Sequence, residues 1–266
     1  MPNPPAARPD WASEAGEDRF GRWADIRLGN ARQRLRWIES GLFWMGSPED
    51  EPERSDHEGP RHQVTLTSGF WLFDTPVTQA LWQAVMGDNP SWFTGADRPV
   101  EQVSWDDVQQ FLERINGRMP GLDLALPTEA QWEYACRAGT TTATYAGPME
   151  ILSSDTAPVL DAIAWYRGNS GDGTHPVGQK APNPWGLYDM LGNVWEWCAD
   201  DKRPYGPGPA TDPAGPHSRA ERSSSRALRG GAWSNHARFV RAAIRYAGTP
   251  DSRIGIIGFR CARGRP

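Results

Sequence analysis

Cysteine and histidine are the residues of this chain that could hold a metal ion or act as nucleophiles, and their spacing favours neither role. The three cysteines form no CxxC pair, and no two of the five histidines stand at i and i+4 or as HxH. They are Cys136, Cys198, Cys261, His57, His62, His175, His217 and His236. A zinc site or a disulfide framework needs closely spaced pairs. We therefore expect buried reduced thiols and histidines with structural roles.

The elements that would position functional side chains are short and separated by turns. The 266 residues include 28 glycines and 24 prolines, a share well above the roughly 12% of ordinary usage. Only 38% of residues are hydrophobic, yet there are 14 tryptophans. We expect a core built from indole rings whose N–H groups find partners. The tryptophans expected there are Trp71, Trp82, Trp105, Trp132, Trp195 and Trp197.

Three helices and one strand are predicted from periodicity and capping. Residues 78–87 carry apolar residues at helical spacing and end in glycine, which favours a short helix. Residues 104–118 and 128–139 each begin with a capping box before an amphipathic run. Alternation over residues 62–67 predicts a half-buried strand. The long stretch from 140 to 230 is rich in turn residues, and loops of that length in a compact domain are usually functional.

Charge and hydropathy exclude two classes of partner. The net charge is −5 and no basic stripe occurs, so nucleic acid is not expected as a ligand. No run approaches the eighteen or so apolar residues of a membrane helix, and the N-terminus has no leader pattern, so we expect a cytoplasmic protein without membrane contact. Residues 1–30 are expected to be a flexible or loosely docked arm. The acidic residues Glu49, Asp50, Glu51 and Glu53 predict a solvated loop.

Six ordered blocks spread over residues 36–264 resemble one known family. They are GFWLFDTPVTQALWQAVMG, RPVEQVSWDDVQQFLERIN, LPTEAQWEYACRAGT, THPVGQKAPNPWGLYDMLGNVWEWCAD, RALRGGAWSNHARF and PDSRIGIIGFRCARG. Together they resemble the formylglycine-generating-enzyme domain, also called the sulfatase-modifying-factor domain. The resemblance implies an α+β, irregular C-type-lectin-like fold over residues 31–266: a small twisted antiparallel sheet, two main helices and long loops.

The resemblance also shows where this chain departs from the oxidase. In that enzyme two cysteines after a Gly-Gly pair bind copper(I), and soft thiolates are the ligands that copper(I) prefers. Aligning Gly230 and Gly231 places Ala232 on the enzyme's serine, and Asn235 and Val240 on its two cysteines. We therefore expect no copper and no catalytic residue. The family resemblance places Cys136 and Cys261 on a disulfide of the secreted enzyme, and in a cytoplasmic protein we expect adjacent reduced thiols.

The C-terminal block resembles the variable segment of a diversity-generating retroelement protein. There a reverse transcriptase misincorporates at adenines, so that Asn codons of a template become many residues. From Ser234 to Pro266 the chain contains no Lys, Glu, Gln, Met or Trp, which changes at adenine of an AAC codon cannot produce. The alternative is an arginine-rich terminus that lacks them by chance. The predicted variable region spans about 232–257, with Ser234, Asn235, His236, Phe239, Ile244, Tyr246, Ala247, Gly248, Ser252, Ile254, Gly255 and Ile256 as the ligand-binding positions.

We also predict residues that hold the variable segment in place, and one site for a metal ion. Trp233, Arg238, Arg241, Arg245, Asp251 and Arg253 are expected to hold the segment, because guanidinium groups can tie loop carbonyls to carboxylates. The resemblance implies a calcium site at Asn193 and Glu196, since a hard cation suits oxygen ligands. Glu196 in a buried salt bridge is the alternative. No cofactor is required by this interpretation.

The sequence thus predicts a non-enzymatic ligand-binding protein that displays diversified residues on a C-type-lectin scaffold. Its ligand is expected to be a protein or another macromolecule. A metal-dependent oxidase or hydroxylase, or a catalytically inactive accessory domain, are the alternatives, since fold alone does not fix function.

Overall fold

The computed structural model describes residues 8–214 and 225–264. The helices are α1 (Gln79–Met86), α2 (Trp105–Arg118), α3 (Glu129–Arg137) and α4 (Pro158–Asp161), with 3₁₀ turns η1 (Asp56–Glu58) and η2 (Ala237–Phe239). The strands are β1 (Glu14–Asp18), β2 (Gly21–Leu28), β3 (Ala31–Ile38), β4 (Gly41–Met45), β5 (His62–Leu66), β6 (Phe70–Phe73), β7 (Leu124–Ala125), β8 (Trp195–Asp201), β9 (Ala210–Thr211), β10 (Arg226–Arg229), β11 (Arg245–Gly248), β12 (Ile257–Gly258) and β13 (Ala262–Arg263).

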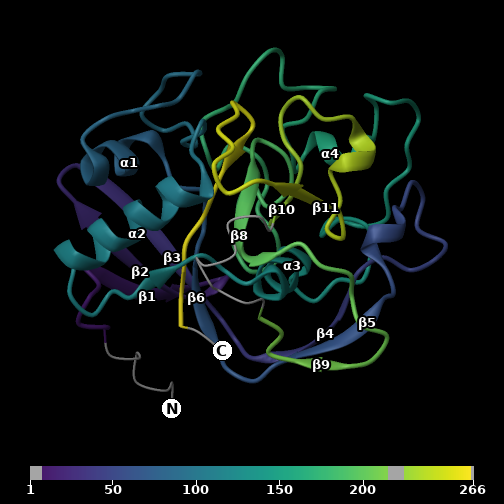
Figure 1. The fold of residues 1–266 in the computed structure, drawn as a ribbon, viewed down its shortest axis with the longest axis horizontal. Helices are drawn as coiled ribbons and strands as arrows, with labels where there is room; N and C mark the ends of the chain where they lie inside the picture. Colours follow the sequence, from purple (N-terminus) through teal and green to yellow (C-terminus); the bar gives the residue numbers. More distant parts are fainter. Residues whose placement is uncertain (1–7, 215–224, 265–266) are drawn as a thin grey trace.

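Within these residues the strands form three mainly antiparallel sheets. The largest has the order β1-β2-β3-β6-β13-β7, a second has the order β11-β10-β8-β12, and β4-β5-β9 form the third. Helices α1 and α2 lie beside the large sheet, and α3 packs against β4, β8 and β10 near the middle of the molecule (Figure 1). Long irregular segments connect these elements, so the α+β fold class and the predominance of loops between 140 and 230 are confirmed.

The predicted helices and strand are confirmed, together with their end signals. Ser104 and Asp107 form a reciprocal capping box at the start of α2, and Thr128 and Gln131 do so for α3. Gly87 ends α1 in the left-handed conformation, with φ of 93°, where a residue without Cβ is unstrained. The predicted strand at 62–67 is β5.

The predicted N-terminal arm is wrong for the described part of residues 1–30. Strands β1 and β2 pair with each other, and β2 pairs with β3, so residues 14–28 belong to the large sheet. Ala24, Asp25 and Ile26 are all fully buried. Asp25 accepts hydrogen bonds from Arg32 and Arg34 on β3, so a carboxylate is held inside the sheet by two guanidinium groups. Residues 1–7 lie outside the described residues.

The tryptophan-built core is confirmed, since all six tryptophans expected in it are buried. At least four of them also donate an indole N–H hydrogen bond, which favours their burial, and Trp82 donates to Asp88. The Trp105 indole donates to Cys198 O, the Trp197 indole donates to Val103 O, and the Trp132 indole donates to Glu196. These bonds link α2 and α3 to β8, so the rings position the loops as well as filling space.

Candidate functional site

The C-terminal segment begins where β10 ends in two glycines. Gly230 and Gly231 both adopt positive φ, 97° and 78°. A Cβ at Gly231 would lie 2.5 Å from Phe239 O, so no other residue fits this turn. The chain then forms η2, returns as β11 beside β10, and passes through residues 249–256 to β12 (yellow in Figure 1). The candidate binding face is presented by this segment.

Arg241 ties the segment to the acidic loop near residue 50. Its guanidinium is fully buried and donates to Glu51 at 2.5 Å and to both oxygens of Glu58 at 2.6 and 2.7 Å. It also donates to the carbonyls of Glu53 and Arg238. All five N–H donors of the side chain are therefore engaged. The prediction of a solvated acidic loop is wrong for Glu51, which is buried against this arginine.

Arg245 and Arg229 make comparable ties to α3. Arg245 binds Glu129 with two parallel hydrogen bonds of 2.6 and 2.7 Å and donates to two loop carbonyls, those of His57 and Arg203. Arg229 on β10 is paired with Glu133 at 2.5 Å and donates to the Ala242 and Ala243 carbonyls. Bidentate pairs of this kind fix geometry as well as adding energy. The base of the segment is thus held by buried charge pairs.

The other predicted supporting residues lie nearer the surface. Trp233 donates its indole N–H to Gly255 O and its backbone N–H to Asn193 O, so it joins the two ends of the segment. Arg253 is exposed, and its guanidinium donates two hydrogen bonds to the carboxylate of Asp107 in α2. Arg238 is also exposed and lies over the Phe239 ring, 4.7 Å from its centroid. Asp251 is exposed, and the Thr249 hydroxyl holds the pKa of its carboxyl below the usual range.

Most of the twelve predicted ligand-binding residues reach the surface, but three have features of the scaffold. Ile244 is buried in the core beside Trp195 and Trp197. A Cβ on Gly248 would lie 2.6 Å from the Trp197 ring, so only glycine fits there without displacing that ring. Asn235 closes a turn, because its side-chain oxygen accepts from the Ala232 N–H. The prediction of Ile244 as a ligand-binding position is therefore wrong, because its side chain is buried.

Eleven of the twelve positions are exposed or half-buried, and we call the nine of them that have no such scaffold role the C-terminal face. They are Ser234, His236, Phe239, Tyr246, Ala247, Ser252, Ile254, Gly255 and Ile256. Tyr246 is 58% exposed and lies against Trp195, and Ile254 is 47% exposed. His236 hydrogen-bonds Asp155 at 2.5 Å. The face therefore combines aromatic, aliphatic and polar side chains on a base of buried ion pairs.

The positions of the two copper ligands hold groups unsuited to copper(I). Val240 is fully buried and apolar, and Asn235 has its side-chain oxygen engaged as described. All three cysteines are free and buried elsewhere. Burial raises the pKa of the Cys136 thiol to about 12, which opposes the thiolate form that binds soft metals. Among the described residues there is no group of three His, Cys, Asp or Glu side chains that could hold a metal ion.

The residues expected at a calcium site are otherwise engaged. Both oxygens of Glu196 accept hydrogen bonds from Arg260, at 2.7 and 2.8 Å. Asn193 O accepts from Trp233, and the Asn193 side chain bonds the backbone of His175. A guanidinium already fills the place of a cation, so this donor set does not fit Ca²⁺. Glu196 instead forms the buried salt bridge that was the alternative.

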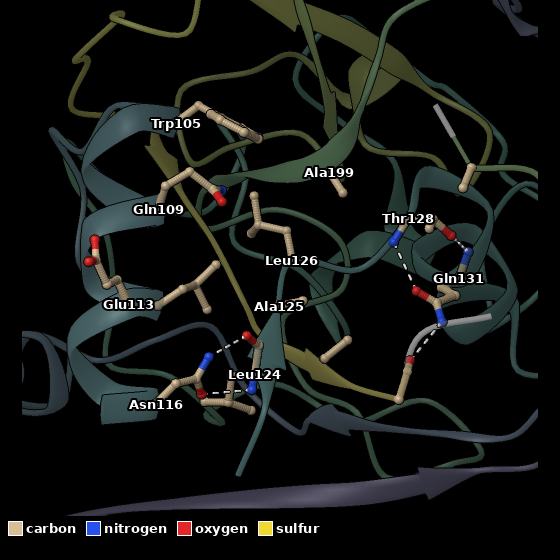
Figure 2. A pocket seen from close by; sticks show the side chains of 14 residues that line it. Trp105, Gln109, Glu113, Asn116, Leu124, Ala125, Leu126, Thr128, Gln131 and Ala199 are labelled. Atoms are coloured by element: carbon tan, nitrogen blue, oxygen red, sulfur yellow. Dashed lines mark hydrogen bonds between the residues drawn. The ribbon is translucent and has the colours of Figure 1, made fainter. Parts of the chain in front are cut away.

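One cavity lies away from the C-terminal face, between α2, β7 and the start of α3 (Figure 2). It measures about 640 Å³. Asn116 exchanges two hydrogen bonds with Leu124 in its wall, and Thr128 and Gln131 are committed to the cap of α3. Glu113 is the one ionisable side chain among the described residues of its wall. One carboxylate without a second acid, base or nucleophile is not a catalytic constellation.

Comparison with known proteins identifies the family to which the domain belongs. The model of the sulfatase-modifying factor enzyme 1-like domain matches residues 29–265. The chain belongs to this family. This sulfatase-modifying-factor domain has the C-type-lectin-like fold expected of it, and the match begins just before β3, so β1 and β2 precede it.

Relatives of this domain include active, inactive and variable proteins. The formylglycine-generating enzyme of Thermomonospora curvata is 36% identical over 217 residues, covering 75% of this chain and 65% of the relative. The inactive C-alpha-formylglycine-generating enzyme 2 of Bos taurus is 31% identical over 226 residues, covering 77% and 63%. Variable protein 1 of Treponema denticola superposes with a TM-score of 0.76 at 30% identity, covering 92% of this chain and 99% of that one. The chain spans less than two thirds of the length of the two curated relatives.

No helix within the described residues has the length and apolar character needed to cross a membrane.

Proposed function

We propose that this sulfatase-modifying-factor domain is a non-enzymatic binding protein whose C-terminal face is diversified by a retroelement and contacts a protein or another macromolecule. The observation that carries the proposal is the alternation along the segment. Buried arginines that are each tied to a glutamate alternate with partly exposed positions that make few fixed contacts. Such a segment tolerates change at the surface because its backbone is fixed from below.

Three further observations support the same function. The domain superposes along nearly its whole length on a protein named as variable. The copper positions are occupied by an amide and a buried valine. The nine residues of the C-terminal face include Tyr246, Phe239 and His236, whose flat side chains supply contact area at a low cost in conformational entropy. The free, buried cysteines favour a reducing compartment such as the cytoplasm.

Sequencing the gene and its neighbourhood from several isolates tests the proposal. We expect substitutions concentrated at the nine positions of the C-terminal face, a nearby template repeat rich in Asn codons, and a reverse-transcriptase gene. Positions 235, 244 and 248 should vary least, because their side chains or their lack of one serve the fold. Isolates whose variation is spread evenly along the chain, without such a repeat, would refute it.

An oxidase is the second candidate, favoured by the 36% identity to a formylglycine-generating enzyme. Purified protein incubated with copper(I) and a cysteine-containing peptide would consume oxygen and yield a formylglycine product if it were such an enzyme. We expect no stoichiometric copper and no oxygen uptake above that of a Val240→Ala control, which changes the same region without adding a thiol.

A further inference from the structure

A pocket of about 340 Å³ opens beside the C-terminal face, between η2 and the loop that precedes α4. It is lined by Glu53, Ile151, Ser153, Ser154, His236 and Arg238. The side chains of His236 and Arg238 are 35% and 53% exposed, so a ligand can reach both from solvent. His236 belongs to the C-terminal face, whereas residues 151–154 lie outside the segment predicted to vary.

The two walls of this pocket are held together by their backbones. The Ala237 N–H donates to Ser154 O at 2.9 Å, and the Arg167 N–H donates to Asn235 O at 3.0 Å. A Cβ on Gly168 would lie 2.0 Å from the carbonyl oxygen of residue 155, so the chain passes this loop at a distance that requires glycine. The pocket is therefore formed before a ligand binds, which lowers the entropic cost of binding.

The imidazole of His236 is oriented by a carboxylate outside the pocket. His236 Nδ1 lies 2.5 Å from Asp155 Oδ1, and Asp155 is not among the residues that line the cavity. An ionised carboxylate only accepts hydrogen bonds, so the proton of this bond is on Nδ1, and Nε2 of the neutral ring is an acceptor. Among the described residues Nε2 has no hydrogen-bond partner. A carboxylate on one ring nitrogen also makes the other more basic.

The charges around the pocket balance one another. Arg238 lies 4.0 Å from Glu53, and Arg167 lies 3.5 Å from the second oxygen of Asp155. Each carboxylate that faces His236 or the cavity thus has a guanidinium beside it. The pocket therefore favours a neutral group that donates a hydrogen bond to Nε2 over an ion of either sign.

The remaining walls suit an aromatic ring. Ile151 is half-buried and packs against the core, and the next residue, Leu152, is an exposed large apolar side chain. The Arg238 guanidinium already lies over the Phe239 ring, 4.7 Å from its centroid, and such a planar group can stack on a second ring as well. The volume is sufficient for one aromatic side chain.

We propose that this pocket is a subsite for a phenol, the side chain of a tyrosine on a protein ligand. The proposal deepens the proposed function and rests on it for the identity of the ligand as a protein. The phenol hydroxyl donates to His236 Nε2, and the ring packs between Ile151 and the Arg238 guanidinium. A phenylalanine at the same place would leave Nε2 without a donor, so tyrosine is preferred. Asp155 is a positioning residue, because it keeps the proton on Nδ1.

The probe for this subsite is N-acetyl-tyrosinamide. N-acetyl-phenylalaninamide lacks the hydroxyl, and the O-methyltyrosine analogue keeps the oxygen but cannot donate. Binding is followed by the ¹⁵N signals of the His236 ring and by the backbone amide signals of residues 151–154. We expect the tyrosine amide to shift the Nε2 signal saturably and to bind about 5- to 10-fold more tightly than either analogue, which corresponds to one hydrogen bond.

Three variants separate the roles of the residues. His236→Phe keeps a flat ring without an acceptor, and should bind all three amides equally. His57→Phe changes an exposed histidine outside the pocket, and should keep the preference for tyrosine. Asp155→Ala should weaken binding of the tyrosine amide and bring the ¹⁵N shifts of the two ring nitrogens closer together, because both tautomers become populated. A loss of support for the backbone alone would not produce this change in the ring signals.

Three results would overturn the subsite. They are the absence of a saturable shift with the tyrosine amide, equal affinity of the parent protein for the tyrosine and phenylalanine amides, and a preference for tyrosine that survives in His236→Phe.

The two proposals fail separately. A phenol preference at His236 in a gene that shows no concentrated variation would refute diversification and leave the subsite standing. Concentrated variation without a phenol preference would do the reverse.

Discussion

The tie between Arg241 and the acidic loop gives the sharpest test of how the C-terminal face is supported. Replacing Arg241 with methionine keeps much of the aliphatic bulk and removes all five hydrogen bonds of the guanidinium. Glu51 and Glu58 are then left facing each other in a buried site. Removing one partner of a buried ion pair costs about 3–5 kcal/mol.

Proton uptake by a glutamate gives a second estimate of the stability lost in Arg241→Met. An uncompensated glutamate can take up a proton, and at pH 7 this costs about 3.7 kcal/mol, because pH 7 lies about 2.7 units above the ordinary Glu pKa. In the variant the folded state binds this proton more tightly than the unfolded chain does, so the variant's stability falls as pH rises through that interval. The deficit of Arg241→Met should therefore be about 3–5 kcal/mol at pH 7.5 and clearly smaller at pH 5.

The assay is urea denaturation at both pH values, with Arg253→Met as the matched control. Arg253 also pairs with a carboxylate, but its side chain is 54% exposed. Exposed pairs contribute 0–1 kcal/mol, so the control should lose less than about 1 kcal/mol at either pH. Similar losses of stability in the two variants, or a loss in Arg241→Met that does not depend on pH, would show that buried charge pairs do not support the C-terminal face.

Three further predictions follow from the surroundings of single residues. Gly248→Ala should lower the free energy of unfolding by about 1–3 kcal/mol, because its Cβ would overlap the Trp197 ring, whereas Gly255→Ala should be nearly neutral. Equal losses in urea denaturation would contradict the assignment of position 248 to the scaffold. Burial raises the pKa of Asp189 to about 6, so the folded state holds a proton between about pH 4 and 6 that the unfolded chain releases, and stability falls with rising pH across that window. Asp189→Asn should gain about 3 kcal/mol relative to the parent between pH 4 and pH 7, measured as melting temperature against pH; parallel curves would exclude this titration. The three free cysteines, of which Cys136 has a pKa raised to about 12 by burial, should resist iodoacetamide until the protein is denatured, and rapid native labelling seen by mass spectrometry would show that they are accessible.

The local part of the fold could be predicted from the sequence because its signals are local. The capping boxes at Ser104 and Thr128 and the glycine at 87 lie within one turn of the helices that they start or stop. The N-terminal hairpin was beyond reach for a physical reason. Asp25 is a charged residue at a fully buried position, and its partners Arg32 and Arg34 make that position tolerable only after β3 has paired.

The C-terminal face could be predicted only in outline for a related reason. The restricted residue alphabet after Trp233 marks the segment, but it does not tell which positions face outward. Gly248 is excluded by the Trp197 ring, and the acidic residue Glu51 is buried by an arginine 190 positions later in the chain. Contacts between residues this far apart in the sequence cannot be predicted from the pattern of neighbouring residues.

The long separation of the arginine ties also bears on the order in which the chain folds. The contacts of Arg241 with Glu51 and Glu58, and of Arg245 with Glu129, close loops of 116 to 190 residues. Contacts this distant in sequence are entropically expensive and tend to form after the local helices and hairpins. Substitutions on the C-terminal face should then leave the rate of folding nearly constant and act mainly on the rate of unfolding. A segment that docks last can change its residues freely without delaying the steps that build the rest of the protein.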